Sequence, residues 1–269
     1  MPKVSKLAVL LAGDFRTFPQ AAEYIFEHAE SQAESVDYFF ACWDHTSDSW
    51  YNQEIREQTR RPVTDQELIA PFQLHNAHLV DYVLLSQEER SHLPNNTAYY
   101  QCYLGKVACI LKRKHELESQ MVYDMVIELR PDLFINANSC PDRLNDFKVN
   151  LEYDLDRAQF PCATDFYYRC NSFTNDVMSE RYNHSKIEKG NYFFFENYLT
   201  SWPMPMNAHW LPLDYIYSRR LEATPNFAPA TVMIPIRPTF PKEDLRKIPV
   251  SKLVEIFDKY WDDTRGKKS

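Results

Sequence analysis

The chain has 269 residues, of which 44% are apolar and 25% charged, a balance typical of a folded protein with a substantial core. Its net charge of −8 and its scattered basic residues argue against nucleic acid as a partner. The four glycines form no phosphate-binding motif and no nucleophile elbow, which excludes dinucleotide-binding Rossmann enzymes, P-loop NTPases and α/β-hydrolases as these are usually recognised.

The cysteines and the apolar runs indicate the compartment. Six cysteines include no CxxC pair, so we expect free thiols in a reducing compartment. The apolar run 7–12 is too short for a signal peptide or a membrane span. We therefore expect a cytoplasmic protein without a transmembrane segment.

The first forty residues predict a strand, a helix and a second strand. Residues 6–12 form a continuous apolar run that ends at Gly13, as in a parallel strand covered on both faces. A helical pattern follows from Pro19, and a second apolar run spans 36–41. This order is typical of a right-handed βαβ unit.

The pattern continues to residue 135. A capping box at 64–67 opens a helix that extends to about Phe72, and 79–85 is a third strand. Residues 97–119 predict a long amphipathic helix, and 123–135 a fourth strand that is interrupted where polar residues appear. Four charged residues are expected to cluster at the exposed end of the long helix: Lys112, Arg113, Lys114 and Glu116.

The second half is less regular. After Pro141 we expect short strands at 160–163 and 166–168, and helices at 174–182, from about Glu196 and at 250–261. The predicted fold is α/β, with a mostly parallel central sheet flanked by helices and an irregular α+β C-terminal half. Residues 1–140 and 141–269 are expected to form two halves of one compact domain.

Polar residues follow three of the predicted strands. Ligands of open α/β sheets bind at the carboxyl ends of the strands, where this chain places Gly13 with Arg16, then Asp44, then Arg130 with Asp132. A glycine lets a backbone approach a ligand closely, and an arginine binds phosphate bidentately. Gly13 followed by an acid is equally consistent with a plain turn.

Arg130 and Asp132 are two residues apart on a segment predicted to be extended. Such side chains project to one side, so both could address one ligand or one divalent cation. The alternative is a local ion pair at the end of a strand.

These segments together resemble a group of GT-A-type glycosyltransferases of microbes and large viruses. The resemblance rests on residues 13–18 after the first strand, residues 37–44 at the second, and residues 123–133 around Arg130-Pro-Asp132. It continues weakly to about residue 220. The arginine stands where the family's Asp-x-Asp motif has its first acid.

The resemblance implies a GT-A-like fold and a glycosyltransferase with a nucleotide-sugar donor, UDP or GDP, and a glycan or related hydroxyl acceptor. Gly13 and Arg16 would lie near the diphosphate, and Asp44 near the base or ribose. Arg130 and Asp132 would replace the metal and diphosphate motif, with Asp132 as the ligand of Mn²⁺ or Mg²⁺. Residues 1–140 would bind the donor and 141–269 the acceptor.

The resemblance implies Glu196 as the acid that activates the acceptor, with Asp165 as the second candidate. Glu196 follows three aromatic residues that would raise its pKa toward that of a general base, although it equally fits a helix N-terminus. Four aromatic residues are candidates either for stacking on sugars or for plain packing: Tyr167, Tyr168, Trp202 and Trp210.

The sequence also bears on two other functions. A sugar-phosphate nucleotidyltransferase needs a glycine-rich basic loop after the first strand, which is missing. A catalytically silent glycosyltransferase-like module that binds a glycan or a nucleotide remains the alternative, since a fold persists when its chemistry is lost.

Overall fold

The computed structural model describes residues 3–48, 53–93, 97–135, 148–153, 163–180, 222–225, 233–236, 238, 240–249, 252–253, 255–256 and 259. The helices are α1 (Phe18–Gln32), α2 (Gln53–Thr59), α3 (Asp65–Leu74), α4 (Gln87–Ser91), α5 (Thr97–Ser119), α6 (Ser172–Ser179) and the 3-10 helix η1 (Leu245–Lys247). The strands of the main sheet are β1 (Val4–Ala12), β2 (Ala33–Trp43), β5 (His78–Leu85), β6 (Met125–Leu129), β8 (Lys148–Tyr153), β9 (Ala163–Cys170) and β10 (Glu222–Pro225). Two short pairs are β3 (His45–Thr46) with β4 (Arg61–Pro62) and β7 (Leu133–Ile135) with β11 (Met233–Pro235).

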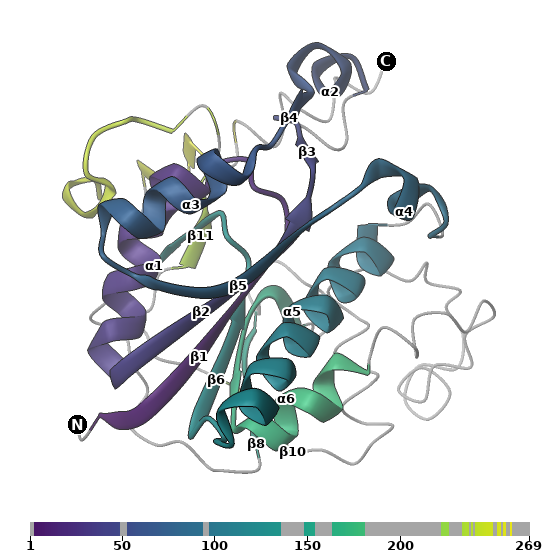
Figure 1. The fold of residues 1–269 in the computed structure, drawn as a ribbon. Helices are drawn as coiled ribbons and strands as arrows, with labels where there is room; N and C mark the ends of the chain where they lie inside the picture. The colour runs from purple at the N-terminus through teal and green to yellow at the C-terminus, as the bar shows by residue number, and fades with distance from the viewer. Residues whose placement is uncertain are drawn as a thin grey trace, which may run out of the picture.

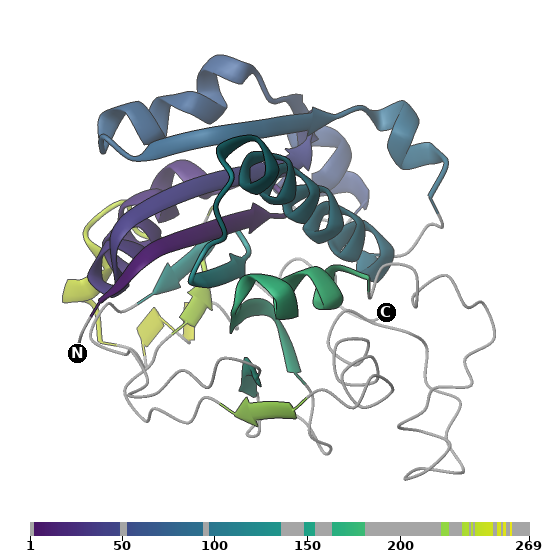
Figure 2. The same ribbon diagram turned by 60° about the horizontal axis from the view of Figure 1, so that its bottom comes forward.

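The main sheet is mixed but mostly parallel, with the order β10-β8-β9-β6-β1-β2-β5. Strands β5, β2, β1 and β6 are parallel, whereas β9 is antiparallel to both β6 and β8. Helices α1 and α3 cover one face, and α5 and α6 lie on the other (Figure 1, Figure 2). The predicted α/β class and the parallel arrangement of the first strands are confirmed.

The N-terminal strand β1 lies at the centre of the sheet. Every residue from Leu7 to Ala12 is fully buried, which confirms that this continuous apolar run is covered on both faces. Alternate residues contribute to two apolar clusters, one under α1 and one under α5. The prediction of βαβ topology from residues 6–41 is therefore confirmed.

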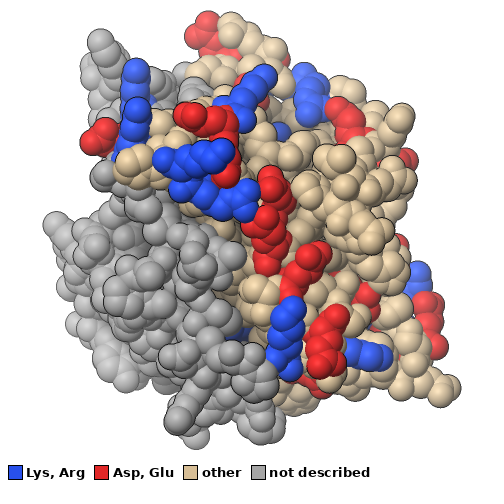
Figure 3. Space-filling model, turned by 90° about the vertical axis from the view of Figure 1, so that its left-hand side faces the viewer, with Lys and Arg blue, Asp and Glu red and all other residues tan. Residues whose placement is uncertain are grey.

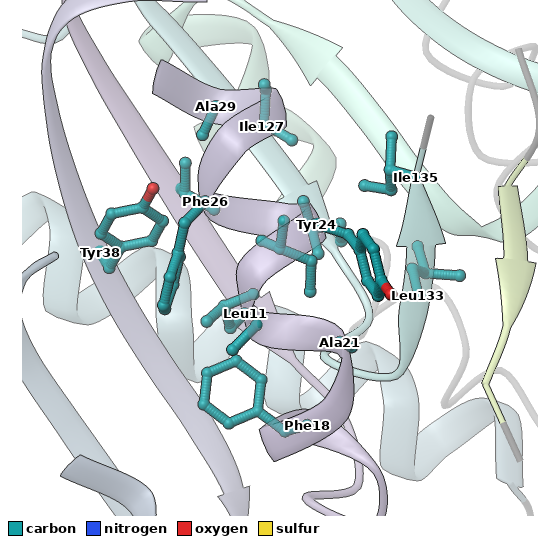
Figure 4. Close-up of a cluster of buried hydrophobic side chains, with 14 of the residues drawn as sticks. Leu11, Phe18, Ala21, Tyr24, Phe26, Ala29, Tyr38, Ile127, Leu133 and Ile135 are labelled. Carbon is teal, nitrogen blue, oxygen red and sulfur yellow. The ribbon is translucent and has the colours of Figure 1, made fainter. Parts of the chain in front are cut away.

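Aromatic rings of helix α1 pack against both the main sheet and β7 (Figure 4). Phe26 lies edge-on to Tyr38 with ring centroids 4.9 Å apart, and Tyr24 lies edge-on to Phe134 at 4.8 Å. Such pairs add about 0.5–1.5 kcal/mol to the burial of the rings. They fix the helix that begins directly after the β1 loop.

Several local predictions hold with adjusted bounds. The capping box that opens α3 is present, with Thr64 accepting from the amide of Glu67 and the Glu67 carboxylate accepting from that of Thr64. The long helix spans 97–119 as predicted. The strand predicted over 123–135 is two strands, β6 and β7, in different sheets. Helix α6 ends before the predicted residue 182, and the helix predicted near Glu196 lies outside the described residues.

The charged cluster predicted at the exposed end of α5 is only half right. Lys112 is fully buried and donates to Ser172 and to Asp176 of α6, while Glu116, also buried, accepts from the Ser172 hydroxyl. Arg113 and Lys114 are exposed, as expected. The prediction failed for Lys112 because α6, 60 residues later, packs on this end of α5.

The C-terminal segment returns to the first helix. Arg246 contacts Glu23 at 3.0 Å, Glu27 and Asp244, and its guanidinium lies over the ring of Tyr24. On the face in Figure 3, basic and acidic side chains are interspersed over the described surface. Upstream, the β11 residue Pro235 pairs with Leu133 of β7, so the segment also reaches the carboxyl edge of the main sheet.

Two remaining predictions concern thiols and membranes. Cys42, Cys102, Cys109 and Cys170 are buried free thiols, while Cys140 and Cys162 lie outside the described residues. Within the described ranges, no helix has both the length and the apolar composition for a bilayer crossing.

Candidate functional site

The candidate site lies where the parallel strands β5, β2, β1 and β6 end. Backbone hydrogen bonds join the first residue after β1 and the first residue after β2 to the neighbouring strand: Gly13 donates to Ala41 of β2 at 3.2 Å, and Asp44 donates to Leu85 of β5 at 2.8 Å. Gly13 and Asp44, both predicted as site residues, are therefore held at the same edge of the sheet. This is the edge at which open α/β sheets bind ligands.

Gly13 lies in a crowded position. Its φ is +153°, and a Cβ atom added to it would lie 2.8 Å from Cδ of Pro131. The side chain of Gln101, from α5, donates to the carbonyl of Ala12 at 2.8 Å. Three segments therefore meet at Gly13: the loop after β1, the turn after β6, and helix α5. Only glycine fits between them.

Asp14, Arg16 and Thr46 form a connected group beside Gly13. Nη2 of Arg16 contacts Asp14 at 3.1 Å, and the Thr46 hydroxyl donates to the other Asp14 oxygen at 2.6 Å and accepts from the Arg16 amide at 3.0 Å. The Arg16 side chain is 7% exposed. Its Nε is buried without a hydrogen-bond partner in the described part of the chain.

Two neighbouring side chains, those of His45 and Gln87, contact the carboxylate of Asp44. His45 Nδ1 lies 2.9 Å from Asp44 Oδ1, and Gln87 at the start of α4 donates to the same oxygen at 3.3 Å. The Asp44 side chain is 32% exposed, so it remains accessible to a ligand. A ribose hydroxyl or a base N–H is the kind of donor that such a carboxylate accepts.

Arg130 and Asp132 form a bidentate ion pair. Arg130 donates from Nε to Oδ1 at 2.9 Å and from Nη2 to Oδ2 at 2.6 Å. Residues 131–132 form a turn, so the prediction of an extended segment is wrong, and the pair matches the alternative of a local ion pair. Asp132 is 1% exposed, and its carbonyl accepts from the amide of Ile236 at 2.6 Å.

The described residues do not fit a divalent cation at Asp132. Both of its oxygens are engaged by Arg130, which carries the positive charge that a cation would supply there. No group of three His, Cys, Asp or Glu side chains in the described ranges could hold a metal ion.

Two titratable groups near Asp14 are shifted mainly by burial. Burial raises the pKa of Asp48, against the opposing charges of Arg16 and Arg61, while Asp14 raises it further. Burial also raises the pKa of the Cys42 thiol, and Asp14 and Asp44 add to this effect. Cys42 is consequently an inert core thiol rather than a nucleophile.

Among the other predicted residues, Tyr167 and Asp165 belong to the part of β9 that reaches this edge, because β9 is antiparallel to β6 and Tyr167 lies opposite Leu129, the last residue of β6. Glu196, Trp202 and Trp210 lie outside the described residues, and Asp165 is described only by its backbone position in β9. Tyr167 and Tyr168 are 2% and 4% exposed, which supports packing rather than sugar stacking.

Sequence reasoning missed the side chains that fasten the site together. Thr46 and Gln87 follow the ends of strands, so their position was a signal for them. Gln101 and Arg90 lie on helices whose patterns gave no such signal. Arg90 lies with its guanidinium 4.4 Å from the centroid of the Tyr100 ring.

The comparisons with known proteins give likenesses among solved structures only. No family model matches the chain, and no curated protein matches it. The chain is similar to a glycosyltransferase involved in glycosylation of the major capsid of PBCV-1, with 7% identity, a TM-score of 0.38 and 82% of each chain covered. It is also similar to the galactosyltransferase LgtC in complex with donor and acceptor sugar analogs, with 12% identity and a TM-score of 0.39 over 78% of this chain and 70% of that one.

A further similar structure is the glycosyltransferase GlyE of Streptococcus pneumoniae TIGR4, with 10% identity and a TM-score of 0.41. The match covers 82% of this chain but 46% of GlyE, so the chain spans less than half of that protein's length. At these TM-scores and identities, the likenesses establish neither a family nor an activity for this chain.

Proposed function

We propose that the chain is a glycosyltransferase that moves a sugar from a nucleotide diphosphate sugar to a hydroxyl of a glycan or related acceptor. The support comes from the carboxyl edge of the sheet, where guanidinium groups and a reachable carboxylate lie together without a glycine-rich loop. Side chains, rather than a nest of backbone amides, must then neutralise the diphosphate.

One observation carries this proposal. The buried guanidinium of Arg16 has an Nε without a partner in the described ranges, and Arg16 lies in the loop that begins at Gly13 after β1. A buried N–H without an acceptor costs about 1–3 kcal/mol. A phosphate oxygen at this position would supply the acceptor, and the donor's binding energy would offset that cost.

The residue roles follow from the order of the strands. Gly13 and Arg16 would contact the diphosphate, and Asp44 on the neighbouring strand would accept from the ribose or the base. Arg130 would neutralise the charge that develops on the diphosphate leaving group, with Asp132 fixing the plane of its guanidinium. This charge stabilisation needs no cation at Asp132.

The acceptor side of the proposal rests on the second half of the chain. Residues 1–140 would bind the donor and 141–269 the acceptor. Glu196, with Asp165 as the second candidate, would remove the proton of the acceptor hydroxyl as it attacks the anomeric carbon. Both roles are proposals that depend on the sequence alone.

The test is a panel of nucleotides. We would measure the thermal unfolding midpoint and calorimetric binding with UDP, GDP and their sugars, for the wild type and for Arg16→Lys and Arg130→Gln. Arg113→Gln is the matched control, because Arg113 is 52% exposed at the opposite end of α5. We expect one nucleotide to stabilise the wild type and the control, by about 2.7 kcal/mol at a hundred times Kd, and to act less on the two site variants.

The outcomes separate the functions. If neither UDP nor GDP changes the unfolding of the wild type, the assignment of a donor site is wrong. Binding with release of sugar to water or to an acceptor supports a transferase. Binding without turnover across many acceptors would instead support the catalytically silent module.

A further inference from the structure

The short helix α4 carries a third arginine, Arg90, near the candidate site. Helix α4 is fastened by a capping box in which Ser86 accepts from the amide of Glu89 at 3.1 Å. Gln87 and Arg90, three residues apart, lie on one face of this helix. Gln87 reaches Asp44, so the same face brings Arg90 beside the end of β2.

Aromatic rings fix the guanidinium of Arg90. It lies 4.4 Å from the ring centroid of Tyr100 and 5.5 Å from that of Trp43. Trp43 is itself 2% exposed and stacks on Tyr103, with ring centroids 6.2 Å apart and an interplanar angle of 16°. Aromatic rings orient the planar guanidinium of an arginine by stacking and cation–π contacts.

The pKa of Arg90 responds to other residues of the candidate site. Partial burial lowers the pKa of Arg90 and the charge of Arg56 lowers it further, while a hydrogen bond with Tyr100 and the charge of Asp14 raise it. An arginine stays protonated in proteins, so the group remains a cation. Arg90 therefore lies within electrostatic reach of Asp14, and its helix is tied to Asp44.

We propose that Arg90 is a phosphate-binding residue of the site and holds the diphosphate of the donor. This inference rests on the proposed function, in which Asp44 binds the nucleoside and the Gly13 loop binds the diphosphate. The helix of Arg90 contacts Asp44, and Arg90 lies within electrostatic reach of Asp14 in the loop that begins at Gly13. A bound nucleoside diphosphate would extend from Asp44 to this loop. Trp43 and Tyr100 act as positioning residues, because they touch the guanidinium rather than the ligand.

The test compares a diphosphate with its nucleoside. We would measure Kd by calorimetry for UDP, GDP, uridine and guanosine with the wild type, Arg90→Gln and Arg90→Lys, and with Arg113→Gln as the control. A charge-assisted contact is worth about a tenfold to hundredfold change in affinity. We expect Arg90→Gln to bind the nucleoside diphosphate more weakly than the wild type by this factor and to bind the nucleoside with unchanged affinity. The diphosphate affinity of Arg90→Lys should lie between those of the wild type and Arg90→Gln, and that of the control should equal the wild type's.

A pair of variants at Tyr100 tests the aromatic contact separately. Tyr100→Phe keeps the ring beside Arg90 but removes the hydroxyl that hydrogen-bonds to it, whereas Tyr100→Leu removes both. We therefore expect Tyr100→Phe to weaken diphosphate binding less than Tyr100→Leu does. Unfolding midpoints without ligand show whether each variant is folded, and Arg90→Lys preserves the charge and the aliphatic stem if Arg90→Gln does not fold.

The results distinguish this inference from the proposed function. If Arg90→Gln binds the diphosphate as tightly as the wild type does, Arg90 is no phosphate ligand and the proposed function stands. An equal loss for the diphosphate and the nucleoside also overturns the inference. If the wild type binds neither UDP nor GDP, the proposed function fails and this inference fails with it.

Discussion

Both carboxylate oxygens of Asp132 accept hydrogen bonds from Arg130, one from Nε at 2.9 Å and one from Nη2 at 2.6 Å. The guanidinium of Arg130 thus lies against the carboxylate oxygens that a divalent cation at Asp132 would have to contact. The carbonyl of Asp132 accepts from Ile236, whose own carbonyl accepts from the hydroxyl of Thr17. Asp132 therefore takes part both in the ion pair and in the hydrogen bonds that connect the turn after β6, through Ile236, to the residue before α1.

Nucleotide binding should be independent of divalent cations. Because Arg130 engages both oxygens of Asp132, we expect UDP or GDP to stabilise the protein equally in EDTA and in Mn²⁺. The measurement is the thermal shift at fixed nucleotide concentration, with Ca²⁺ as a further control. A shift that vanishes in EDTA and returns with Mn²⁺ would show that Asp132 releases Arg130 to bind metal.

Removing Arg130 alone should cost more than removing the pair. Arg130→Gln leaves a carboxylate that is 1% exposed without its guanidinium partner, for which a loss of about 3 kcal/mol is expected. The double variant with Asp132→Asn removes the buried charge and should recover part of that loss. Urea unfolding of the two single variants and the double variant measures the coupling. Strictly additive losses would mean that the two groups do not act as a pair.

Gly13→Ala should destabilise the protein and weaken nucleotide binding together. The added Cβ would lie 2.8 Å from Cδ of Pro131, and the φ of +153° is strained for any L side chain. We expect a loss of about 1–3 kcal/mol. Pro131→Ala in the same chain removes the clashing atom and should restore part of the stability, although the backbone strain remains. No recovery on urea unfolding would locate the cost entirely in the backbone.

Local sequence patterns predicted those parts of the fold that depend on local physics. The apolar run at 7–12 required burial on both faces, and the capping box at Thr64 required a helix start, so both were visible in the chain. The placement of Gly13 and Asp44 at one edge of the sheet was also predictable, since it follows from where parallel strands end. Whether these two residues bind a ligand stays a prediction.

Long-range partners could not be read from the sequence. Helical spacing places Lys112 on α5, but only the packing of α6 decides that its ammonium is buried against Ser172. In the same way, Leu133 pairs with Pro235, about one hundred residues later in the chain. Arg90 was missed because all five residues of α4 are polar, so the sequence shows no hydrophobic periodicity that would indicate a helix there. The aromatic rings that contact Arg90 also come from two other elements, β2 and α5.

Lys112 and Arg113 should differ sharply in their contribution to stability. Both contact Asp176, but the Lys112 side chain is 0% exposed and that of Arg113 is 52% exposed. Lys112→Met leaves the carboxylates of Glu116 and Asp176 without their buried cation and should cost about 3–5 kcal/mol. Arg113→Ala should cost less than about 1 kcal/mol, because solvent screens an exposed ion pair. Chemical denaturation of both variants checks this, and equal losses would contradict the buried position of Lys112.

Stability should fall with acid because of His28, which is buried between Tyr167 and Gln32. Burial, with the charge of Arg169, lowers its pKa from 6.5 to about 4. The unfolded chain therefore binds a proton in this window that the folded chain does not, so the stabilisation is complete above pH 6.5 and is lost as the pH falls toward 4. The expected loss is about 3 kcal/mol, from about 1.4 kcal/mol per pKa unit.

The test is urea unfolding from pH 7.5 to 4.5 with His28→Gln, and with His92→Gln as an exposed control. Carboxylates also titrate at the acid end, so the informative quantity is the difference in unfolding free energy between the wild type and each variant. For His28→Gln, which carries no titrating ring, this difference should shrink as the pH falls, because only the wild type loses the His28 contribution. His92→Gln removes an imidazole from an exposed position and serves as the comparison for the loss of a histidine outside the core. Parallel curves for the wild type and His28→Gln would show that His28 takes up its proton without unfolding, and that the buried contacts to Tyr167 and Gln32 do not hold it neutral.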